Sequence, residues 1–267
     1  MSYLLLNIPA PPINKIGFVY IYGLTMALAV LAATYVSHVR YRARHPEQSK
    51  ESNVIIDLFI YVVIAGFLGA RIYHLFTGYN WEEDGISGVL AIRNGGLSIW
   101  GAVIGGAIAL YFLAKKRKLS FLELGDSIAV GLCVGQFIGR FGNYFNQELF
   151  GKPFNGPWAL EVDSEFRPAG YEMYSTFHPT FLYEGLFCLA IAGLIIFLEK
   201  RKNWPRGASL ATYIAFYCLG RVFMEWLRID DAQEIFGLRF NLLLSIILSV
   251  AAFAWLFKIL KQKVSLG

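Results

Sequence analysis

Arginines inside long apolar runs are the residues of this chain best suited to chemistry. Two polar sets recur at helical spacing within such runs: Tyr217, Arg221, Glu225 and Arg228 in one, and Arg140, Asn143 and Gln147 in the other. Spacings of three and four place each set on one face of a helix. A guanidinium binds phosphate or carboxylate through two parallel N–H donors, most strongly where water is scarce. We therefore expect the two sets to converge on an anion.

These arginines also have structural interpretations. Arg221 and Glu225 suit an intrahelical ion pair at positions i and i+4. Arg71 and Arg228 lie near the ends of apolar runs, from which a long side chain reaches the lipid headgroups. Arg140 has no acidic residue within reach in its own helix, so we expect it to be unpaired and functional.

The composition of the chain indicates which kind of element positions these residues. The chain has 267 residues, of which 56% are hydrophobic and only 16% charged, and its mean hydropathy is +0.49. Soluble domains are about one quarter charged, so an ordinary soluble domain, a disordered chain and a coiled coil are excluded. Cys133, Cys188 and Cys218 lie inside apolar runs, which predicts buried free thiols rather than disulfides. The scattered histidines predict no metal site, and no motif predicts a cofactor.

Seven apolar runs are long enough to cross a bilayer, which takes about 20 helical residues. They cover approximately residues 18–36, 54–76, 97–114, 127–144, 181–198, 208–227 and 242–260. The sequence therefore predicts an all-α integral membrane protein with seven transmembrane helices. Residues 1–267 are expected to form a single transmembrane domain, with loop 145–180 as a candidate lid or head.

Basic residues alternate between the connecting segments and indicate the orientation. After the first span, the loops and the tail hold in turn 4, 1, 4, 2, 4, 2 and 3 Lys or Arg residues. Cytoplasmic segments carry the positive excess, so we expect the N-terminus outside and the C-terminus in the cytoplasm. This pattern accounts for the net charge of +5 without a nucleic-acid partner. The ionisable residues within the spans then gather in the outer half, apart from Asp57 and Asp126 at inner ends.

Three other classes of membrane protein were compared with this pattern. A transporter of organic anions would need a polar path across the whole membrane, whereas these polar residues stop at the outer half. A retinal receptor needs a lysine in the middle of its last helix, and Lys258 lies at the inner end. An intramembrane serine protease needs a G-x-S-G serine and a histidine on another helix, and neither is evident.

One segment carries a specific resemblance. Residues 139–151 read GRFGNYFNQELFG, which is similar to the signature G-R-x-G-N-[FY]-x-N-x-E-x-x-G of the prolipoprotein diacylglyceryl transferases. Residues 178–184, HPTFLYE, match the family's H-P-x-x-L-Y-E motif, and Gly220-Arg221 with Glu225 and Arg228 resembles its sixth span. The likeness covers almost the whole chain, including Asn7-Ile8-Pro9 at the start.

The resemblance implies an enzyme of the bacterial cytoplasmic (inner) membrane with its active site toward the outer face. The family transfers the diacylglyceryl group of phosphatidylglycerol to the lipobox cysteine of a prolipoprotein signal peptide, forming a thioether and releasing glycerol-1-phosphate. By position, Arg140 and Arg221 would bind phosphatidylglycerol and act in catalysis. The other family positions with implied catalytic or substrate-binding roles are Tyr22, Asn143, Glu148, Gly151, Tyr217 and Arg228.

The chain departs from the family at one position. The third-span motif G-G-x-x-x-H-G, whose histidine is a proposed base, reads GGLSIWG here and places Trp100 at the histidine position. An indole donates a hydrogen bond but cannot accept a proton. We expect Trp100 to pack at the outer interface, and the positive field of Arg140 and Arg221 to favour the thiolate form of the substrate cysteine.

Overall fold

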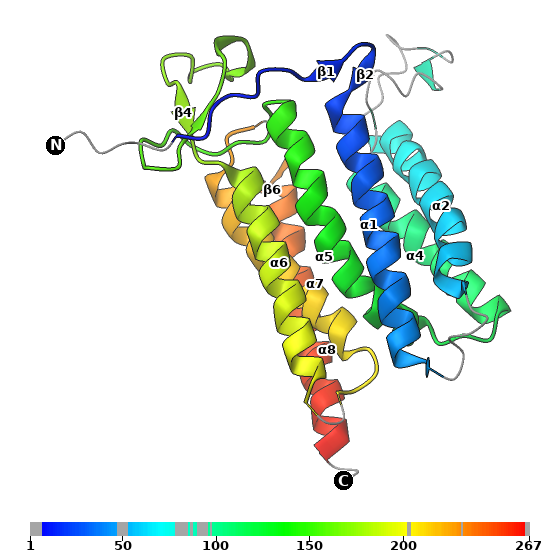
Figure 1. Ribbon diagram of the computed structural model, residues 1–267. Helices are drawn as coiled ribbons and strands as arrows, with labels where there is room; N and C mark the ends of the chain where they lie inside the picture. The colour runs from blue at the N-terminus through cyan, green and yellow to red at the C-terminus, as the bar shows by residue number, and fades with distance from the viewer. Residues whose placement is uncertain are drawn as a thin grey trace. The chain divides into compact units, whose positions relative to one another are not determined.

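Seven helices of 18 residues or more occur in the part of the chain that the structure, a computed structural model, describes: residues 7–46, 53–77, 85, 88–89, 96, 98–201, 204–230 and 232–264 (Figure 1). They are α1 (Ile21–Arg44), α2 (Val54–Thr77), α4 (Ile99–Lys116), α5 (Phe121–Phe145), α6 (Thr180–Glu199), α7 (Ala208–Leu227) and α8 (Phe240–Val264). All except α7 are long and apolar enough to cross a membrane. The helical class expected from the sequence is therefore confirmed.

The remaining elements are short. Three antiparallel ladders have two residues in each strand: β1 (Lys15–Ile16) with β2 (Val19–Tyr20), β3 (Leu160–Glu161) with β4 (Thr176–Phe177), and β5 (Glu234–Ile235) with β6 (Leu238–Arg239). A 3₁₀ turn, η3 (Ser164–Phe166), lies between β3 and β4. The apolar runs did not predict these elements, because ladders of two residues leave no hydropathy pattern.

The chain divides into two compact units, residues Met1–Ser37 with Gly125–Gly267 and residues His38–Leu124. In the second unit, α2 and α4 pack closely through glycines. A Cβ atom at Gly69 would lie 3.1 Å from Gly105 Cα, and one at Gly105 would lie 2.5 Å from the Ala65 carbonyl oxygen. Small residues let helix backbones approach in this way.

The first unit has a similar glycine seam between α1 and α5 (Figure 1). A Cβ atom at Gly135 would lie 3.0 Å from the Ala29 carbonyl oxygen, and one at Gly142 would lie 2.8 Å from both Thr25 Oγ1 and Tyr22 Cδ2. Glycines recurring along α5 therefore hold α1 against it without intervening side chains. The seam fixes the ring of Tyr22 against the turn of α5 that follows Arg140.

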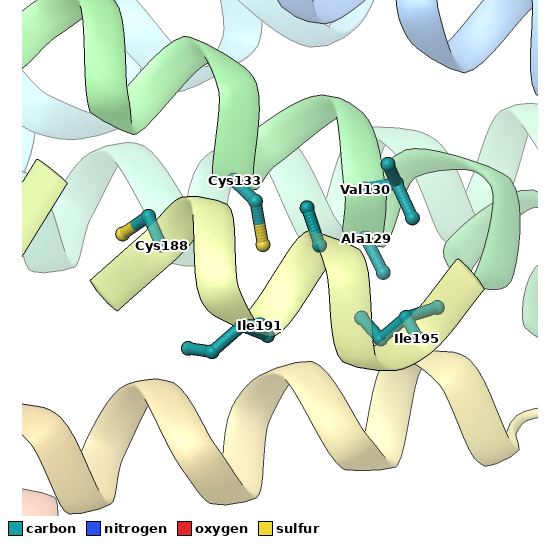
Figure 2. Packing of buried hydrophobic residues seen from close by; sticks show 7 residues of the cluster. Ala129, Val130, Cys133, Cys188, Ile191 and Ile195 are labelled. Carbon is teal, nitrogen blue, oxygen red and sulfur yellow. The ribbon is translucent and has the colours of Figure 1, made fainter. Parts of the chain in front are cut away.

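The core of the first unit lies between α5 and α6 (Figure 2). Cys133 of α5 and Cys188 and Ile195 of α6 are among its buried members, and Tyr213 and Tyr217 of α7 pack against it. The cysteines at 133, 188 and 218 are free and buried, as the sequence predicted. This core continues along the bundle to the layer that holds the charged residues, so α5, α6 and α7 position those residues together.

Asp126, an exception to the outer-half pattern, has a structural role. It lies inside α5, which begins at Phe121, whereas the apolar run was expected to begin at residue 127. Its carboxylate accepts hydrogen bonds from the backbone N–H groups of Gly207 at 2.7 Å and Leu210 at 2.9 Å. Those groups belong to the first turn of α7, whose N–H groups have no partner within the helix. A buried carboxylate of α5 thus caps α7.

Candidate active site

Glu184 of α6 joins the two arginines that the sequence singled out. Arg140 of α5 forms an ion pair with Glu184 Oε2, and Arg221 Nη1 of α7 lies 3.0 Å from Glu184 Oε1 and 3.2 Å from Oε2. The side chain of Glu184 is only 6% exposed, and those of Arg140 and Arg221 are 17% and 14% exposed. The convergence of the two arginines is confirmed, whereas Gln147 lies beyond the end of α5 and binds Asp163 instead. The expectation that Arg140 is unpaired was wrong, because its acidic partner comes from another helix.

Glu225 is a second shared carboxylate, and its side chain is fully buried. It pairs with Arg221 one turn earlier on α7, and its Oε2 lies 2.8 Å from Arg239 Nε of β6. Arg228 Nη1 is 4.0 Å from Oε1. Several cations around one buried carboxylate compensate its desolvation. The i,i+4 pair proposed for Arg221 and Glu225 is therefore present, but as part of a network.

Asp230 extends this network beyond the end of α7. Its carboxylate accepts hydrogen bonds from Arg228 Nε at 2.6 Å and Nη2 at 2.7 Å, and from Arg239 Nη2 at 3.2 Å. Burial opposes ionisation of Asp230, but the hydrogen bonds and positive charges of the two arginines outweigh it and lower its pKa. The Arg228 side chain is 8% exposed, so it does not reach for headgroups as the structural interpretation supposed.

Asn143 connects Arg140 to Glu148. Arg140 Nη1 donates to Asn143 Oδ1 at 3.3 Å, and Asn143 Nδ2 donates to Glu148 Oε1 at 2.8 Å. The chain leaves α5 here through two residues with left-handed backbone, Gln147 at φ 49° and Leu149 at φ 58°. Left-handed backbone is uncommon for residues other than glycine, and at Gln147 it is held by paired hydrogen bonds to Asp163. This turn directs Glu148 back to Asn143.

The remaining expected site residues lie around the same cluster. Electrostatic interactions connect Tyr22 to Glu148 and Arg140, and Tyr217 to Arg140, Glu184 and Arg221. Gly151 forms an antiparallel bridge with Arg228, and a Cβ atom there would lie 2.9 Å from His178 Cβ. The glycine therefore permits close contact between the loop and the end of α7. A cavity of about 420 Å³ next to this contact is lined by Glu148, Asp230 and neighbouring residues.

His178 lies near this loop but outside the charged network. Its ring stacks on Phe154 at 4.1 Å, and its Nδ1 lies 3.2 Å from the Tyr183 hydroxyl, which also accepts a hydrogen bond from Trp158 Nε1. Burial, followed by the positive charge of Lys152, lowers the pKa of His178. The described contacts of the ring are therefore with side chains of the protein, Phe154 and Tyr183.

Two residues discussed from the sequence belong to the other compact unit. Arg71 donates to the carbonyl oxygens of Val89 at 2.9 Å, Gly96 at 3.0 Å and Gly88 at 2.5 Å. It is buried and binds backbone carbonyl groups of the following segment, so the headgroup interpretation of Arg71 was wrong. Trp100 is the second residue of α4 and is half-buried. The preceding glycine of its motif, Gly95, lies outside the described residues.

Three further residues of the network, Glu184, Asp230 and Arg239, were not among the expected site residues. Glu184 is the last residue of the HPTFLYE segment, and Asp230 and Arg239 lie in the loop after the sixth apolar run. Their buried ion pairs give them a place in the site. An acid inside the outer end of an apolar run is the signal that identifies Glu184, whereas a loop arginine such as Arg239 carries none. In the described part of the chain, no group of three His, Cys, Asp or Glu side chains is arranged to hold a metal.

The apolar helices define a helical membrane protein, which holds a buried network of arginines and carboxylates. Residues 11–258 match the family model described as prolipoprotein diacylglyceryl transferase. The chain belongs to the prolipoprotein diacylglyceryl transferase family.

Relatives named phosphatidylglycerol–prolipoprotein diacylglyceryl transferase match over most of the chain. The protein from Corynebacterium diphtheriae is 37% identical over 97% of this chain and 96% of its own length. A second, from Streptomyces coelicolor, is 39% identical over 88% of this chain and 74% of its own. The protein from Cutibacterium acnes is 37% identical over 88% and 81% of the two chains.

Proposed function

We propose that this protein transfers the diacylglyceryl group of phosphatidylglycerol to the lipobox cysteine of bacterial prolipoproteins. The family and the names of the relatives support this reaction. The structural observation that carries it is the junction of Arg140 and Arg221 on one buried carboxylate, Glu184. Two guanidinium groups at one point, in surroundings poor in water, suit a phosphate ester of a lipid.

Negative charge builds up on the phosphate during the reaction. The thiolate sulfur of the substrate attacks the glyceryl carbon next to the phosphate ester oxygen, and a C–S thioether bond forms. The C–O bond breaks, its electron pair stays on the phosphate oxygen, and glycerol-1-phosphate leaves. Donors aimed at the developing charge contribute about 3–4 kcal/mol each in favourable cases. Arg140 and Arg221 have the donor geometry for this role.

Glu184 binds some of the N–H donors of each arginine. A guanidinium has five N–H donors. The phosphate therefore either binds the donors that Glu184 leaves free or displaces the Glu184 carboxylate. Asn143 orients Arg140 and is itself held by Glu148. Tyr22 lies within electrostatic reach of Arg140, and Tyr217 within reach of both Arg140 and Arg221. Gly151 and Arg228 hold the loop against the end of α7.

The proposed setting is the bacterial cytoplasmic membrane, crossed by all seven helices with the N-terminus outside. The basic residues in the last turns of α1 and α4, Arg42 with Arg44 and Lys115 with Lys116, support this orientation. The arginine network then faces the outer side, where loop 145–180 lies over it. From that side, a signal peptide and a lipid of the outer leaflet both reach the site.

The test of the function is direct. Purified protein is incubated with phosphatidylglycerol vesicles and a lipobox peptide, and the peptide mass is measured. We expect a mass increase equal to one diacylglyceryl group on the cysteine, together with release of glycerol phosphate. A peptide with serine in place of that cysteine is the control and should stay unmodified. An unchanged cysteine peptide in the presence of folded protein would contradict the proposal.

A further inference from the structure

Two short hairpins present a phenylalanine at the tip. Phe18 lies between β1 and β2 and is 96% exposed, and Phe236 lies between β5 and β6 and is 97% exposed. Their neighbours are apolar and exposed as well, namely Ile16, Val19, Tyr20, Ile235 and Leu238. Each hairpin is thus an apolar projection that no described residue of the protein covers.

The backbone conformation at position 236 is energetically unfavourable for a phenylalanine. Phe236 and Gly237 have φ values of 54° and 73°, the signs that a type I′ two-residue turn requires. Asn-Gly is favoured in such turns, and a bulky residue in the left-handed region is an outlier. In the other hairpin, Gly17 takes the positive φ of 61° and Phe18 follows it. A fully exposed phenylalanine at a strained turn position stabilises nothing within the chain, so its benefit lies outside it.

Both hairpins run directly into apolar helices. β2 ends at Tyr20 and α1 begins at Ile21, and β6 ends at Arg239 and α8 begins at Phe240. α1 and α8 are among the helices long and apolar enough to cross a membrane, and most of their surface is not covered by the protein. The hairpins therefore continue a lipid-facing surface past the helix ends, where hydrocarbon gives way to headgroups. Aromatic side chains concentrate at this level of membrane proteins.

Charge at the base of each hairpin fits the same location. Lys15 Nζ lies 4.4 Å from the ring centroid of Tyr20, which places a cation beside an aromatic ring at the start of α1. At the other hairpin, Arg239 is drawn inward to Glu225 and Asp230 while Phe236 projects outward. Cationic side chains next to exposed apolar ones are typical of a surface at the headgroup level of a lipid leaflet.

We propose that the β1–β2 and β5–β6 hairpins are membrane-interface anchors, which bury Phe18 and Phe236 among the lipids beside α1 and α8. The occupant of both surfaces is the lipid itself. Because Arg239 belongs to β6, the second anchor also sets the depth of the arginine network relative to the phosphate layer. That last consequence rests on the proposed function, whereas the burial of the two tips does not.

The burial is tested by measuring the depth of spin labels. Single cysteines are introduced as Phe18→Cys and Phe236→Cys, labelled with a nitroxide and reconstituted in phosphatidylglycerol-containing nanodiscs. Relaxation by oxygen, which concentrates in lipid, is compared with relaxation by a water-soluble nickel chelate. Leu28→Cys on α1 is the lipid control, and Ser164→Cys in η3 is the aqueous control. The unmodified protein is the labelling blank, since its own cysteines are buried.

We expect both tip labels to favour oxygen over the nickel chelate, at a ratio near that of the Leu28→Cys label. Ratios near that of Ser164→Cys would overturn the proposal. Labels that are accessible to the chelate in nanodiscs but become protected when a lipobox peptide is added would also overturn it, since the surface would then be covered by the signal peptide.

A substitution at the strained turn separates anchoring from folding. Phe236→Asn places the favoured Asn-Gly pair in the turn, so the melting temperature in detergent should be unchanged or higher. The same variant should lose severalfold activity in vesicles while keeping it in detergent micelles, where depth is not fixed. Met173→Asn, which also removes an exposed apolar side chain, is the matched control and should behave like the unmodified protein. Equal loss in vesicles and micelles would contradict the anchoring role without bearing on the transfer reaction.

Discussion

Arg140 and Arg221 lie on different helices and bind the same carboxylate, that of Glu184. This arrangement keeps two like charges close together. A buried cation without a partner is strongly destabilising, whereas a shared carboxylate offsets the desolvation of both arginines. Glu184 therefore holds the two arginines in place, and under the proposed function it competes with the substrate phosphate for them.

The first prediction concerns Arg140. Arg140→Ala should abolish transfer, with activity reduced by about 100-fold or more because one aimed donor group is lost. Arg140→Lys should be nearly as damaging, since an ammonium group cannot bind Glu184, Asn143 and a phosphate as a planar guanidinium does. The measurement is transfer to a lipobox peptide, with protein level and melting temperature as controls. Near-normal activity of the lysine variant would show that Arg140 acts only through its positive charge.

The second prediction concerns Glu184. Glu184→Gln keeps the shape of the side chain but removes the charge shared by the two arginines. We expect kcat to fall by about tenfold or more, because the guanidinium groups lose their fixed orientation. KM for phosphatidylglycerol should not rise, because a competing anion has been removed. Glu184→Asp should recover part of kcat. A rise in KM with unchanged kcat would show that Glu184 assists lipid binding instead.

The third prediction concerns Trp100. Trp100→Phe should keep substantial activity, because the bulk of the ring is preserved and only the indole donor is lost. Trp100→Ala should cost more through lost packing. A Trp100→Phe variant that is folded but as inactive as Arg140→Ala would assign a chemical role to the indole.

A fourth prediction concerns pH. If the arginines favour the substrate thiolate, transfer by the unmodified enzyme and by Trp100→Phe should rise with pH, with an apparent pKa below the value of about 8.5 for a free cysteine. The rise has this sign because only the deprotonated thiol attacks. The measurement is the initial rate on one peptide across neutral and alkaline pH. An apparent pKa at or above the free value would indicate that the field does not act on the thiol.

The fifth prediction tests the orientation. Cysteines introduced at exposed positions in residues 115–120 should react with an impermeant reagent only after the membrane is opened, and those in loop 145–180 should react in intact cells. Lys116→Cys and Ser164→Cys are suitable positions, since both residues are exposed. The unmodified protein, whose cysteines are buried, serves as the blank. The reverse pattern would invert the topology and place the arginine network on the cytoplasmic side.

The sequence predicted the helices well where hydropathy governs them and less well beyond the apolar runs. The sixth run coincides with α7, but α1 continues to Arg44 and α5 begins at Phe121. Hydropathy does not record these extensions, because polar and basic residues continue a helix as readily as apolar ones outside a membrane. The extended start of α5 places Asp126 inside the helix, where it caps α7.

The candidate site shows the same division between local and tertiary information. Helical spacing placed Arg221 and Glu225 on one face, because the residues belong to one helix. The pairing of Arg140 with Glu184 depends on how α5 and α6 are rotated about their axes, which a single sequence does not encode locally. The inward turn of Arg239 depends on a two-residue hairpin for the same reason.

The contact between Asp126 and the first turn of α7 joins α5 and α7 at one end. A rotation of one helix about this joint therefore displaces its other end. Fourteen residues of α5 separate this joint from Arg140, a length of roughly 20 Å at the rise of a helix. A rotation of only about 3° at the joint would then separate the two guanidinium groups by about 1 Å at the other end. A small change at the joint is thus magnified at the arginines. Substitutions at Asp126 should therefore alter anion binding, although Asp126 itself does not contact the anion.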